Sequence, residues 1–405
     1  MAQPADGFRT RGQPAAVAAA RAMLRGGMPH ALLLTGPAGV GKSTLANDIA
    51  AALLCRDPNP ARHPCRECRS CRALEHDNHP DLHRLGTTGA GAVIPIGGPG
   101  REERGVRDLV RELSLLPVEG GARVAIISPA DRMTEDAQAA FLKTLEEPPA
   151  GTVLILTASD EERLLETIRS RCVRVRLGPV PRRDIEALLV DGGLVDAPLA
   201  ARLARLSGGR PGDAIALARA PTALVIRGEV GRTLLDLIAA TRADRLRVGR
   251  DLLSRTAELT AGLVQAAQPG QAAQPGRAAR TSRGRRAAAV GGDAAPAAGP
   301  TDASADEPEA PGPALRVPAA ERRAAALVLV AIWRDVVRDL AMVGLGVPGD
   351  VRQVDLLDDL EAAAQRLPPA FAATQLGRLD TAGERLEGNV SPELVVDALA
   401  LGWMA

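Results

Sequence analysis

The chain has 405 residues, of which 46% are hydrophobic, and these two values predict a globular protein with two or three domains. Its 50 basic and 49 acidic residues leave a net charge of +1, which excludes a uniformly basic surface for nucleic acid or membrane. No apolar run approaches the roughly 20 residues of a membrane-spanning helix, and the first residues lack the apolar core of a signal peptide. We therefore expect a cytoplasmic protein without membrane contact, in which a cluster of reduced cysteines indicates a metal site.

Short apolar runs alternate with helical patterns from Ala31 to about Leu177, which is typical of a parallel sheet covered by helices. Apolar residues at helical spacing predict one helix over Val106–Leu113 and another over Glu135–Glu147. The expected strands are Ala31–Leu34, Val124–Ile127, Val153–Thr157 and Val173–Leu177.

A phosphate-binding loop follows the first expected strand. Residues 36–43 read GPAGVGKS, which fits the pattern G-x-x-x-x-G-K-[ST], and the helical residues 44–54 follow directly. In such a loop the glycines let backbone N–H groups point at phosphate oxygens, and the lysine reaches the outer phosphates. A plain glycine-rich turn, the structural alternative, does not explain why Lys42, one of only two lysines, stands here. The expected nucleotide-binding residues are Gly36, Gly39, Gly41, Lys42, Ser43 and Thr44, with Ser43 holding Mg²⁺.

Four of the five cysteines follow the P-loop helix in the arrangement C-x9-C-x2-C-x2-C. Thiolates at this spacing can converge on one ion, so the sequence predicts a structural Zn²⁺ site made by Cys55, Cys65, Cys68 and Cys71. A histidine in place of Cys55 is the alternative, because His63, His76, His79 and His83 lie in the same stretch. The set of four cysteines is complete without them, and the last three histidines are expected at the surface.

The strand expected to end at Ile127 lacks the acidic residues of an ATPase. A P-loop ATPase needs a carboxylate at the end of a neighbouring strand to hold Mg²⁺ through water. Here Ser128 and Pro129 follow the strand, and neither carries a charge. Asp131 lies slightly further on, and we expect it to cap the next helix; a carboxylate that turns toward the metal is the alternative. The sequence therefore predicts binding of ATP or ADP without efficient hydrolysis.

Several segments carry a resemblance to a known family. They read PHALLLTGPAGVGKST at 29–44, AQAAFLKTLEEPP at 137–149, VLILTASD at 153–160 and IRSRC at 168–172. Together with the four cysteines they resemble the bacterial clamp-loader branch of the AAA+ ATPases over about residues 8–218. The resemblance implies a RecA-like AAA+ module, and VSPELVVDALAL near the C-terminus is similar to the helical collar of that family.

The resemblance also implies a role for Arg171. In this family the arginine of the SRC motif is donated to the ATP site of the adjacent subunit, where it neutralises charge on the transferred phosphoryl group. A local salt bridge, near Arg169 and Arg174, is the alternative for this side chain. Lys143 lies in the LKTLEEPP helix, where it either pairs with one of the two following glutamates or faces phosphate.

Two departures distinguish the chain from motor subunits of the gamma/tau type. In the family that the chain resembles, motor subunits have Asp-Glu at the position of Ser128-Pro129. They also have a nucleotide-sensing arginine at the position of Gly212. Because SRC is retained, the resemblance implies a non-motor subunit that works with gamma/tau-type and delta-type subunits, the sliding clamp and primed DNA. An ATP-hydrolysing gamma/tau-type subunit is the first alternative. A P-loop nucleotide kinase is the second, although the sequence offers no substrate pocket with its own acid and base.

The expected organisation is α/β followed by all-α, in three domains. Residues 1–178 form the AAA+ P-loop domain with a zinc-binding insertion at 55–83, residues 179–220 form a small helical lid, and residues 221–405 form a helical collar that oligomerises. About 265–313 the chain is rich in Ala, Pro, Gly and Gln, which predicts a disordered insertion.

Strong helices are expected in the collar over Leu327–Leu345 and Leu356–Leu367. The last helix is expected to begin with Ser391 as its N-cap and Pro392 in its first turn. Its predicted apolar face consists of Leu394, Val395, Ala398 and Leu401.

Overall fold

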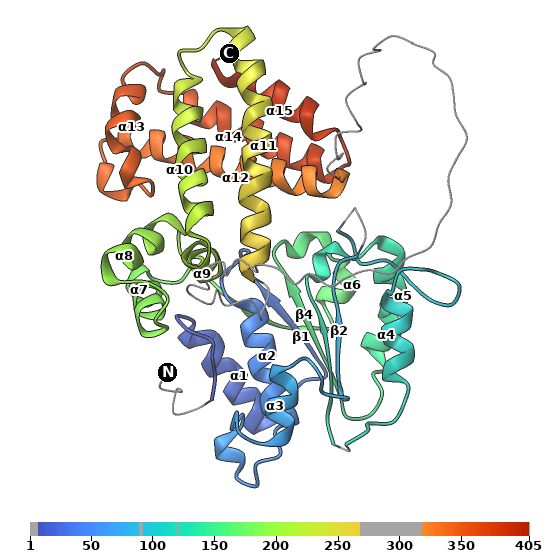
Figure 1. Ribbon diagram of the computed structural model, residues 1–405. Coiled ribbons are helices and arrows are strands. Elements are labelled where there is room, and N and C mark those ends of the chain that lie inside the picture. The colour runs from blue at the N-terminus through green and yellow to red at the C-terminus, as the bar shows by residue number, and fades with distance from the viewer. Residues whose placement is uncertain (1–6, 89–91, 120, 268–317, 405) are drawn as a thin grey trace, which may run out of the picture.

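A computed structural model describes residues 7–88, 92–119, 121–267 and 318–404 (Figure 1). The first half is a parallel sheet with helices on both faces, and the rest of the described chain is helical, which confirms the predicted fold class. The predicted disordered insertion at 265–313 lies outside the described residues, except that residues 265–267 complete a helix of the collar. No helix among the described residues is long and apolar enough to cross a membrane.

The sheet has five parallel strands in the order β2-β3-β4-β1-β5. Strand β4 lies between β1 and β3, so the carboxyl ends of these three strands meet at one edge of the sheet. Their bounds are β1 (Ala31–Thr35), β2 (Leu82–Leu85), β3 (Arg123–Ile127), β4 (Thr152–Ala158) and β5 (Val173–Arg176).

Strand β2 was not predicted, and it shortens the insertion expected at 55–83. Leu82 and His83 belong to the sheet, where they pair with Val124 and Ala125 of β3. The segment LHRL contains no continuous apolar run because β2 is an edge strand, and Leu85 is its one fully buried residue.

Side chains of the buried strands alternate between the two faces of the sheet. Leu32 and Leu34 of β1 pack in the core that includes α1 (Pro14–Gly26) and α2 (Lys42–Leu54). Leu33 packs in the core on the other face with residues of the helices there. Those helices are α4 (Val106–Leu113), α5 (Glu135–Glu146) and the short α6 (Glu166–Arg169).

Helices after the sheet form two further bodies, each with its own core. The first, which corresponds to the expected lid, consists of α7 (Arg182–Asp191), α8 (Ala197–Leu206) and α9 (Pro211–Arg219). The second, which corresponds to the expected collar, occupies the upper part of Figure 1. It consists of α10 (Pro221–Asp236), α11 (Arg242–Ala267), α12 (Ala319–Gly344), α13 (Leu357–Ala364), α14 (Phe371–Glu387) and α15 (Pro392–Leu401).

The predicted apolar face of α15 was wrong. Val395 is buried, but Leu394, Ala398 and Leu401 are exposed, and the helix instead buries Val396, Leu399 and Ala400. The reason is that α15 packs against Gly249 of α11, where Val396 and Ala400 meet a surface without a side chain. Ser391 stands at the N-cap position as expected, but its hydroxyl donates to Glu393 and makes no capping bond to the backbone.

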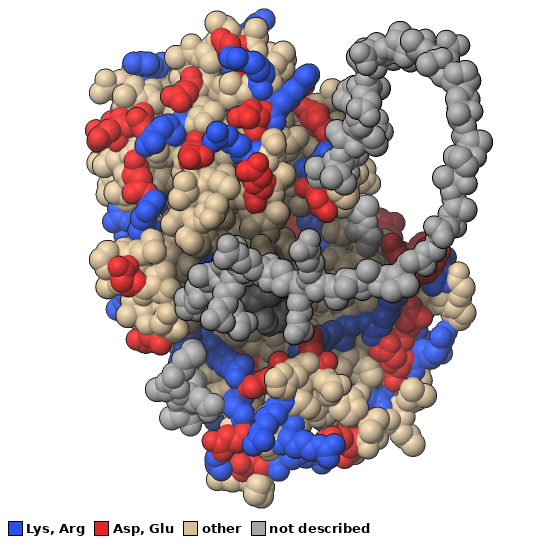
Figure 2. All heavy atoms as spheres, in the orientation of Figure 1, with Lys and Arg blue, Asp and Glu red and all other residues tan. Residues whose placement is uncertain are grey.

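The sheet and the collar are joined by ion pairs. Glu387 at the end of α14 accepts hydrogen bonds from Arg132 and Arg163, which lie in short turns after β3 and β4. Over the collar, on the face in Figure 2, acidic and basic side chains are interspersed and form no broad patch of one sign. This distribution agrees with the net charge of +1.

Candidate functional site

The P-loop connects β1 to α2 and needs glycine at two points of close approach. Gly36 has φ +139°, and a Cβ there would lie 2.1 Å from the carbonyl oxygen of Leu177. Gly39 has φ +78°, and a Cβ there would lie 3.1 Å from a carboxylate oxygen of Asp213 in the lid. Helix α2 begins at Lys42 without a side-chain cap, so its first backbone N–H groups face the loop where phosphate would bind.

Lys42 is 8% exposed and folds back on the loop. Its ammonium group donates to the carbonyl oxygens of Gly36 and Pro37 and, over 3.0 Å, to the hydroxyl of Ser159. Burial lowers the pKa of Lys42 from its usual value, and the negative charge of Asp131 partly offsets this effect. All three N–H bonds of the ammonium group are therefore used within the chain, and a bound phosphate would replace these acceptors.

Two hydroxyl groups stand where an ATPase would place its metal site. Ser128, directly after β3, lies with its Oγ 3.4 Å from the Oγ of Ser43 and accepts a hydrogen bond of 2.7 Å from Thr157. Neither hydroxyl carries the charge that holds Mg²⁺ through water.

Asp131 does not cap the following helix, contrary to the prediction. Thr134 is the N-cap of α5, and its hydroxyl accepts from the N–H of Ala137. One carboxylate oxygen of Asp131 instead accepts from the N–H groups of Ser159 and Asp160, each over 3.0 Å. The other oxygen is buried without a hydrogen-bond partner among the described residues. Asp131 thus holds the loop after β4 that supplies Ser159 to Lys42.

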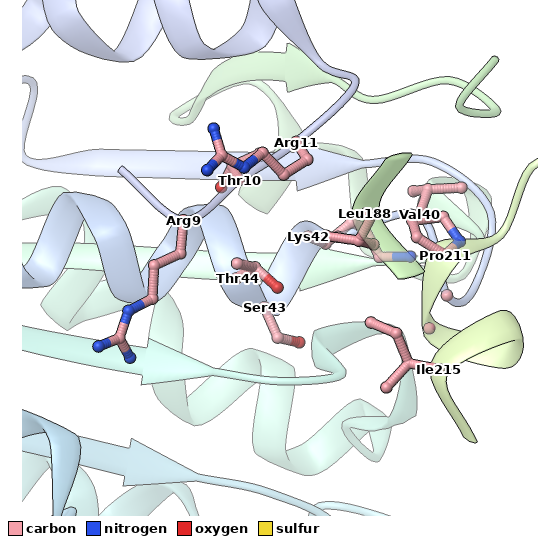
Figure 3. A pocket seen from close by; sticks show the side chains of 13 residues that line it. Arg9, Thr10, Arg11, Val40, Lys42, Ser43, Thr44, Leu188, Pro211 and Ile215 are labelled. Atoms are coloured by element: carbon pink, nitrogen blue, oxygen red, sulfur yellow. The ribbon is translucent and has the colours of Figure 1, made fainter. Parts of the chain in front are cut away.

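A cavity of about 310 Å³ lies between the P-loop, the lid and the N-terminal segment (Figure 3). The lid touches the P-loop directly, because the N–H of Gly212 donates to the carbonyl oxygen of Gly39 over 2.9 Å. A Cβ at Gly212 would lie 3.2 Å from that oxygen, so a longer side chain here requires the lid to shift. The sequence predicted the P-loop residues of this lining. It did not predict six others, because they belong to no motif: Arg9, Thr10, Arg11, Leu188, Pro211 and Ile215.

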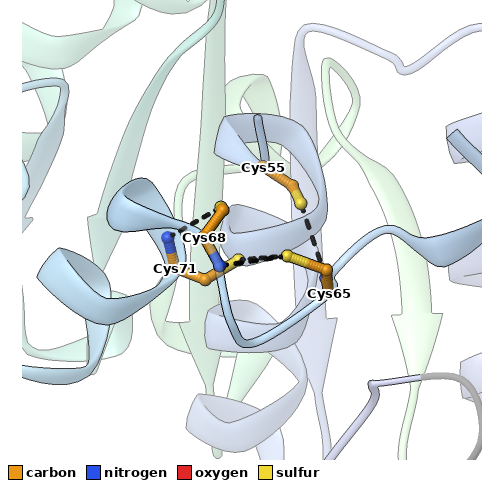
Figure 4. Close-up of side chains that lie close together, drawn as sticks. All are labelled: Cys55, Cys65, Cys68 and Cys71. Atoms are coloured by element: carbon orange, nitrogen blue, oxygen red, sulfur yellow. Dashed lines mark hydrogen bonds between the residues drawn. The ribbon is translucent and has the colours of Figure 1, made fainter. Parts of the chain in front are cut away.

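The four predicted cysteines come together between α2 and α3 (Arg69–Glu75) (Figure 4). Their sulfur atoms all lie within 4.8 Å of one another, and those of Cys65 and Cys71 are 4.0 Å apart. A tetrahedral zinc–thiolate site places its sulfurs about 3.8 Å apart, so the donor set fits Zn²⁺. Backbone N–H groups of Cys65, Cys68 and Cys71 point at sulfur atoms, which favours thiolates.

Burial and hydrogen bonds shift the pKa values of these thiols in different directions. Burial opposes ionisation of Cys68, but hydrogen bonds from the backbone of Cys71 and Arg56 and from neighbouring cysteines lower the pKa of Cys68 to about 7. Burial raises the pKa of Cys71. A zinc ion would supply the charge that keeps all four sulfurs deprotonated.

Three of the four histidines of this stretch have other partners. His79 was expected at the surface but is buried, with Nε2 2.8 Å from the hydroxyl of Ser70 and Nδ1 accepting from the N–H of Asp81. His83 lies in β2 with Nδ1 3.0 Å from Glu112, and His63 Nε2 lies 2.8 Å from the carbonyl oxygen of Asp57. The geometry therefore brings cysteines, and no histidine, around the candidate metal position in the described chain.

Arg171 lies after α6 and is tied to its own chain. Its guanidinium pairs with Glu146 over 2.6 Å and donates to the carbonyl oxygen of Thr167, while the side chain remains 37% exposed. The local salt bridge weighed from the sequence is thus present, although its partner is Glu146 of the LKTLEEPP helix. Lys143 is exposed and makes no ion pair with the described residues, so the first of its two expected roles, pairing with a nearby glutamate, is not observed.

The P-loop, the order of the strands and the lid define this half of the chain as an AAA+ P-loop module. Residues 12–181 match the family model described as DNA polymerase III, delta subunit. Over 184 residues the chain is 40% identical to the DNA polymerase III subunit delta' of Pseudomonas aeruginosa. The matched region makes up 45% of this chain and 53% of that protein. It is 32% identical over 200 residues to the subunit gamma/tau of Mycobacterium tuberculosis, covering 47% of this chain and 32% of that protein.

The part of the chain that matches is therefore similar to DNA polymerase III clamp-loader subunits, and its identity to the Pseudomonas aeruginosa delta' subunit is higher than its identity to the Mycobacterium tuberculosis gamma/tau subunit. The chain spans about half the length of the delta' relatives that it matches. Among solved structures, a gamma subunit-related protein of Thermotoga maritima is similar with a TM-score of 0.37 and 15% identity, covering 96% of this chain and 98% of that one.

Proposed function

We propose that this chain is a delta'-type, non-motor subunit of a DNA polymerase III clamp loader in the cytoplasm. It binds ATP or ADP at the P-loop without efficient hydrolysis, and it works with gamma/tau-type and delta-type subunits to place the sliding clamp on primed DNA. The observation that carries the proposal is the hydroxyl of Ser128, which lies 3.4 Å from the P-loop hydroxyl of Ser43 at the position where hydrolysis requires a carboxylate. The higher identity to the delta' relative supports the same choice of subunit.

Arg171 is proposed to act on the ATP site of a neighbouring motor subunit. In the isolated chain Glu146 holds its guanidinium beside α5, and the exposed part of the side chain is free to meet a partner. When a neighbour's triphosphate approaches, its greater negative charge would compete with the single charge of Glu146. The arginine would then stabilise charge on the transferred phosphoryl group only in the assembled ring.

The test is ATP hydrolysis by the reconstituted ring with gamma/tau-type and delta-type subunits. We expect Arg171→Ala to lower hydrolysis at the served site by at least about 100-fold, while the ring still assembles. Arg174→Ala is the matched control, because Arg174 lies three residues away, is half exposed and has only a distant pair with Glu161. Unchanged hydrolysis with Arg171→Ala would contradict the role of this arginine.

The four cysteines are proposed to hold one structural Zn²⁺. Four thiolates fill a tetrahedral shell, which leaves no open position for catalysis. Zinc would supply a fixed cross-link between the end of α2 and α3, so its role is to fix the loop between them.

A further inference from the structure

Asp48 is a buried carboxylate on α2, and the proposed function gives it no part. It is 1% exposed. One of its oxygens accepts from the backbone N–H of Arg9 over 3.0 Å, from that of Thr10 over 2.8 Å and from the Thr10 hydroxyl over 2.6 Å. Its other oxygen pairs with the guanidinium of Arg66. A buried carboxylate is tolerated only with such partners, so Asp48 depends on both sides of this network.

Arg66 belongs to the cysteine loop, between Cys65 and Cys68. Its side chain is 6% exposed and also donates from Nε to the carbonyl oxygen of Gly7 over 2.8 Å. Its backbone has φ +62°, a left-handed conformation that costs a residue with a side chain about 1 kcal/mol. The loop that gathers the cysteines must hold this conformation, and ligation of the two flanking sulfurs by a metal would fix it.

The segment on the other side of Asp48 forms one wall of the cavity at the P-loop. Arg9, Thr10 and Arg11 line this cavity together with residues 39–44 (Figure 3). A few residues further on, Gln13 donates to the carbonyl oxygens of Val40 in the P-loop and of Gly178 before the lid. The position of this segment therefore sets the width of the cavity next to the P-loop.

We propose that Arg66 and Asp48 are positioning residues through which the metal at the four cysteines controls the shape of the nucleotide pocket. With the metal bound, the loop presents Arg66 to Asp48 and Gly7, and Asp48 holds Thr10 in the pocket wall. Without it, Arg66 leaves, Asp48 loses its counter-charge, and the wall moves as the carboxylate becomes hydrated. This inference rests on the proposed zinc and nucleotide sites.

The first test measures the wall itself and needs no nucleotide. Hydrogen exchange of the Arg9 and Thr10 amides reports their bonds to Asp48, because exchange requires those bonds to open. In zinc-loaded protein we expect Arg66→Gln to speed this exchange at least about 10-fold, with the zinc content unchanged. Removing zinc from the wild type should give the same increase, and removing it from Arg66→Gln should add nothing further. Arg69→Gln, an exposed arginine on α3, is the control and should exchange like the wild type.

The second measurement is the affinity for a fluorescent ADP analogue. We expect Arg66→Gln to bind it about 10-fold more weakly than the wild type, a change of 1.4 kcal/mol, and to lose the dependence of affinity on zinc. If Arg66→Gln fails to retain zinc, Asp48→Asn decides the matter, because it removes the same ion pair without changing any residue of the cysteine loop.

Wild-type amide exchange and wild-type affinity in zinc-loaded Arg66→Gln would overturn the inference. Faster exchange with unchanged affinity would also overturn it, since the wall would then not shape the pocket. A wild type that binds no nucleotide would contradict the proposed nucleotide site, while the amide exchange would still decide whether the metal controls the wall.

Discussion

Asp48 in the P-loop half and Asp339 in the collar are both buried carboxylates that accept backbone N–H groups, yet they join very different parts of the chain. Asp48 joins α2 to a segment 38 residues earlier and to the cysteine loop 18 residues later. Asp339 of α12 accepts from Arg352 and Gln353, 13 and 14 residues later, and thereby holds the turn that precedes α13. The first carboxylate connects segments around a candidate site, whereas the second fixes one connection between helices.

This difference teaches that burial of a polar group does not by itself mark a functional site. In the collar the buried charges are satisfied by nearby backbone groups and by Arg227, Arg338 and Arg352. In the P-loop half Lys42 and Asp131 both hold the loop after β4, and Asp48 holds the segment that lines the cavity. Loss of Asp48 should therefore alter binding, whereas loss of Asp339 should alter stability alone.

The largest expected effect is on the metal. Cys71→Ser replaces a fully buried thiolate by a hydroxyl that cannot close the tetrahedral shell, so we expect the affinity for zinc to fall at least about 100-fold. Metal analysis of the purified protein in the presence of a competing chelator measures this change. Cys172→Ser is the control, because Cys172 is buried outside the cluster, and it should keep one zinc. Full zinc retention by Cys71→Ser would contradict the site.

The next effect sharpens the contrast between the two carboxylates. Asp339→Ala leaves the N–H groups of Arg352 and Gln353 without their acceptor and removes the ion pair of Arg338, so we expect a loss of about 3 kcal/mol in the free energy of unfolding. Urea unfolding followed by circular dichroism measures it. Nucleotide affinity should not change.

Asp380→Ala provides the matched control in the collar. Asp380 pairs with Arg334 on the surface, where its side chain is 64% exposed, so its loss should cost between 0 and about 1 kcal/mol. If Asp339→Ala costs no more than this control, or weakens nucleotide binding, the contrast between the two regions fails.

The smallest expected effect concerns pH and His79. Burial lowers the pKa of His79, against the opposing influence of Glu119 and Asp81. The folded chain therefore prefers the neutral ring, and stability falls as the pH drops below the unfolded value of about 6.5, because the unfolded chain takes up the proton more readily. His79→Gln removes this dependence.

The measurement is the free energy of unfolding between pH 7 and pH 5.5 for the two proteins. The wild type should lose up to about 1 kcal/mol more than His79→Gln over this interval. An equal loss in both would show that burial does not hold His79 in its neutral form.

Much of the first half could be predicted because its motifs are local in sequence. The P-loop, the four cysteines and four of the five strands follow from residue types at fixed spacing, and the structure places them as expected within one or two residues. The pocket wall at residues 9–11 could not be found, since its position depends on a bond to Asp48 that no spacing encodes.

Other errors have similar physical causes. Asp131 was predicted to cap a helix because it precedes α5. In the structure its carboxylate accepts hydrogen bonds from the loop after β4 instead. The buried face of α15 was predicted wrongly because Leu394, Ala398 and Leu401 also share a helical spacing. The neighbouring face, with Val396 and Ala400, is buried instead because it packs against Gly249. In each case the local pattern allowed more than one arrangement, and the packing partner decided between them.

The central claim is that the P-loop of this chain holds nucleotide without hydrolysing it, because Ser128 stands where a carboxylate is required. The most direct test is ATP hydrolysis by the isolated, zinc-loaded chain, with and without primed DNA, beside the Lys42→Ala variant. We predict no hydrolysis above background for either protein. Turnover of about one per second or faster that Lys42→Ala abolishes would contradict the account and identify a motor subunit instead.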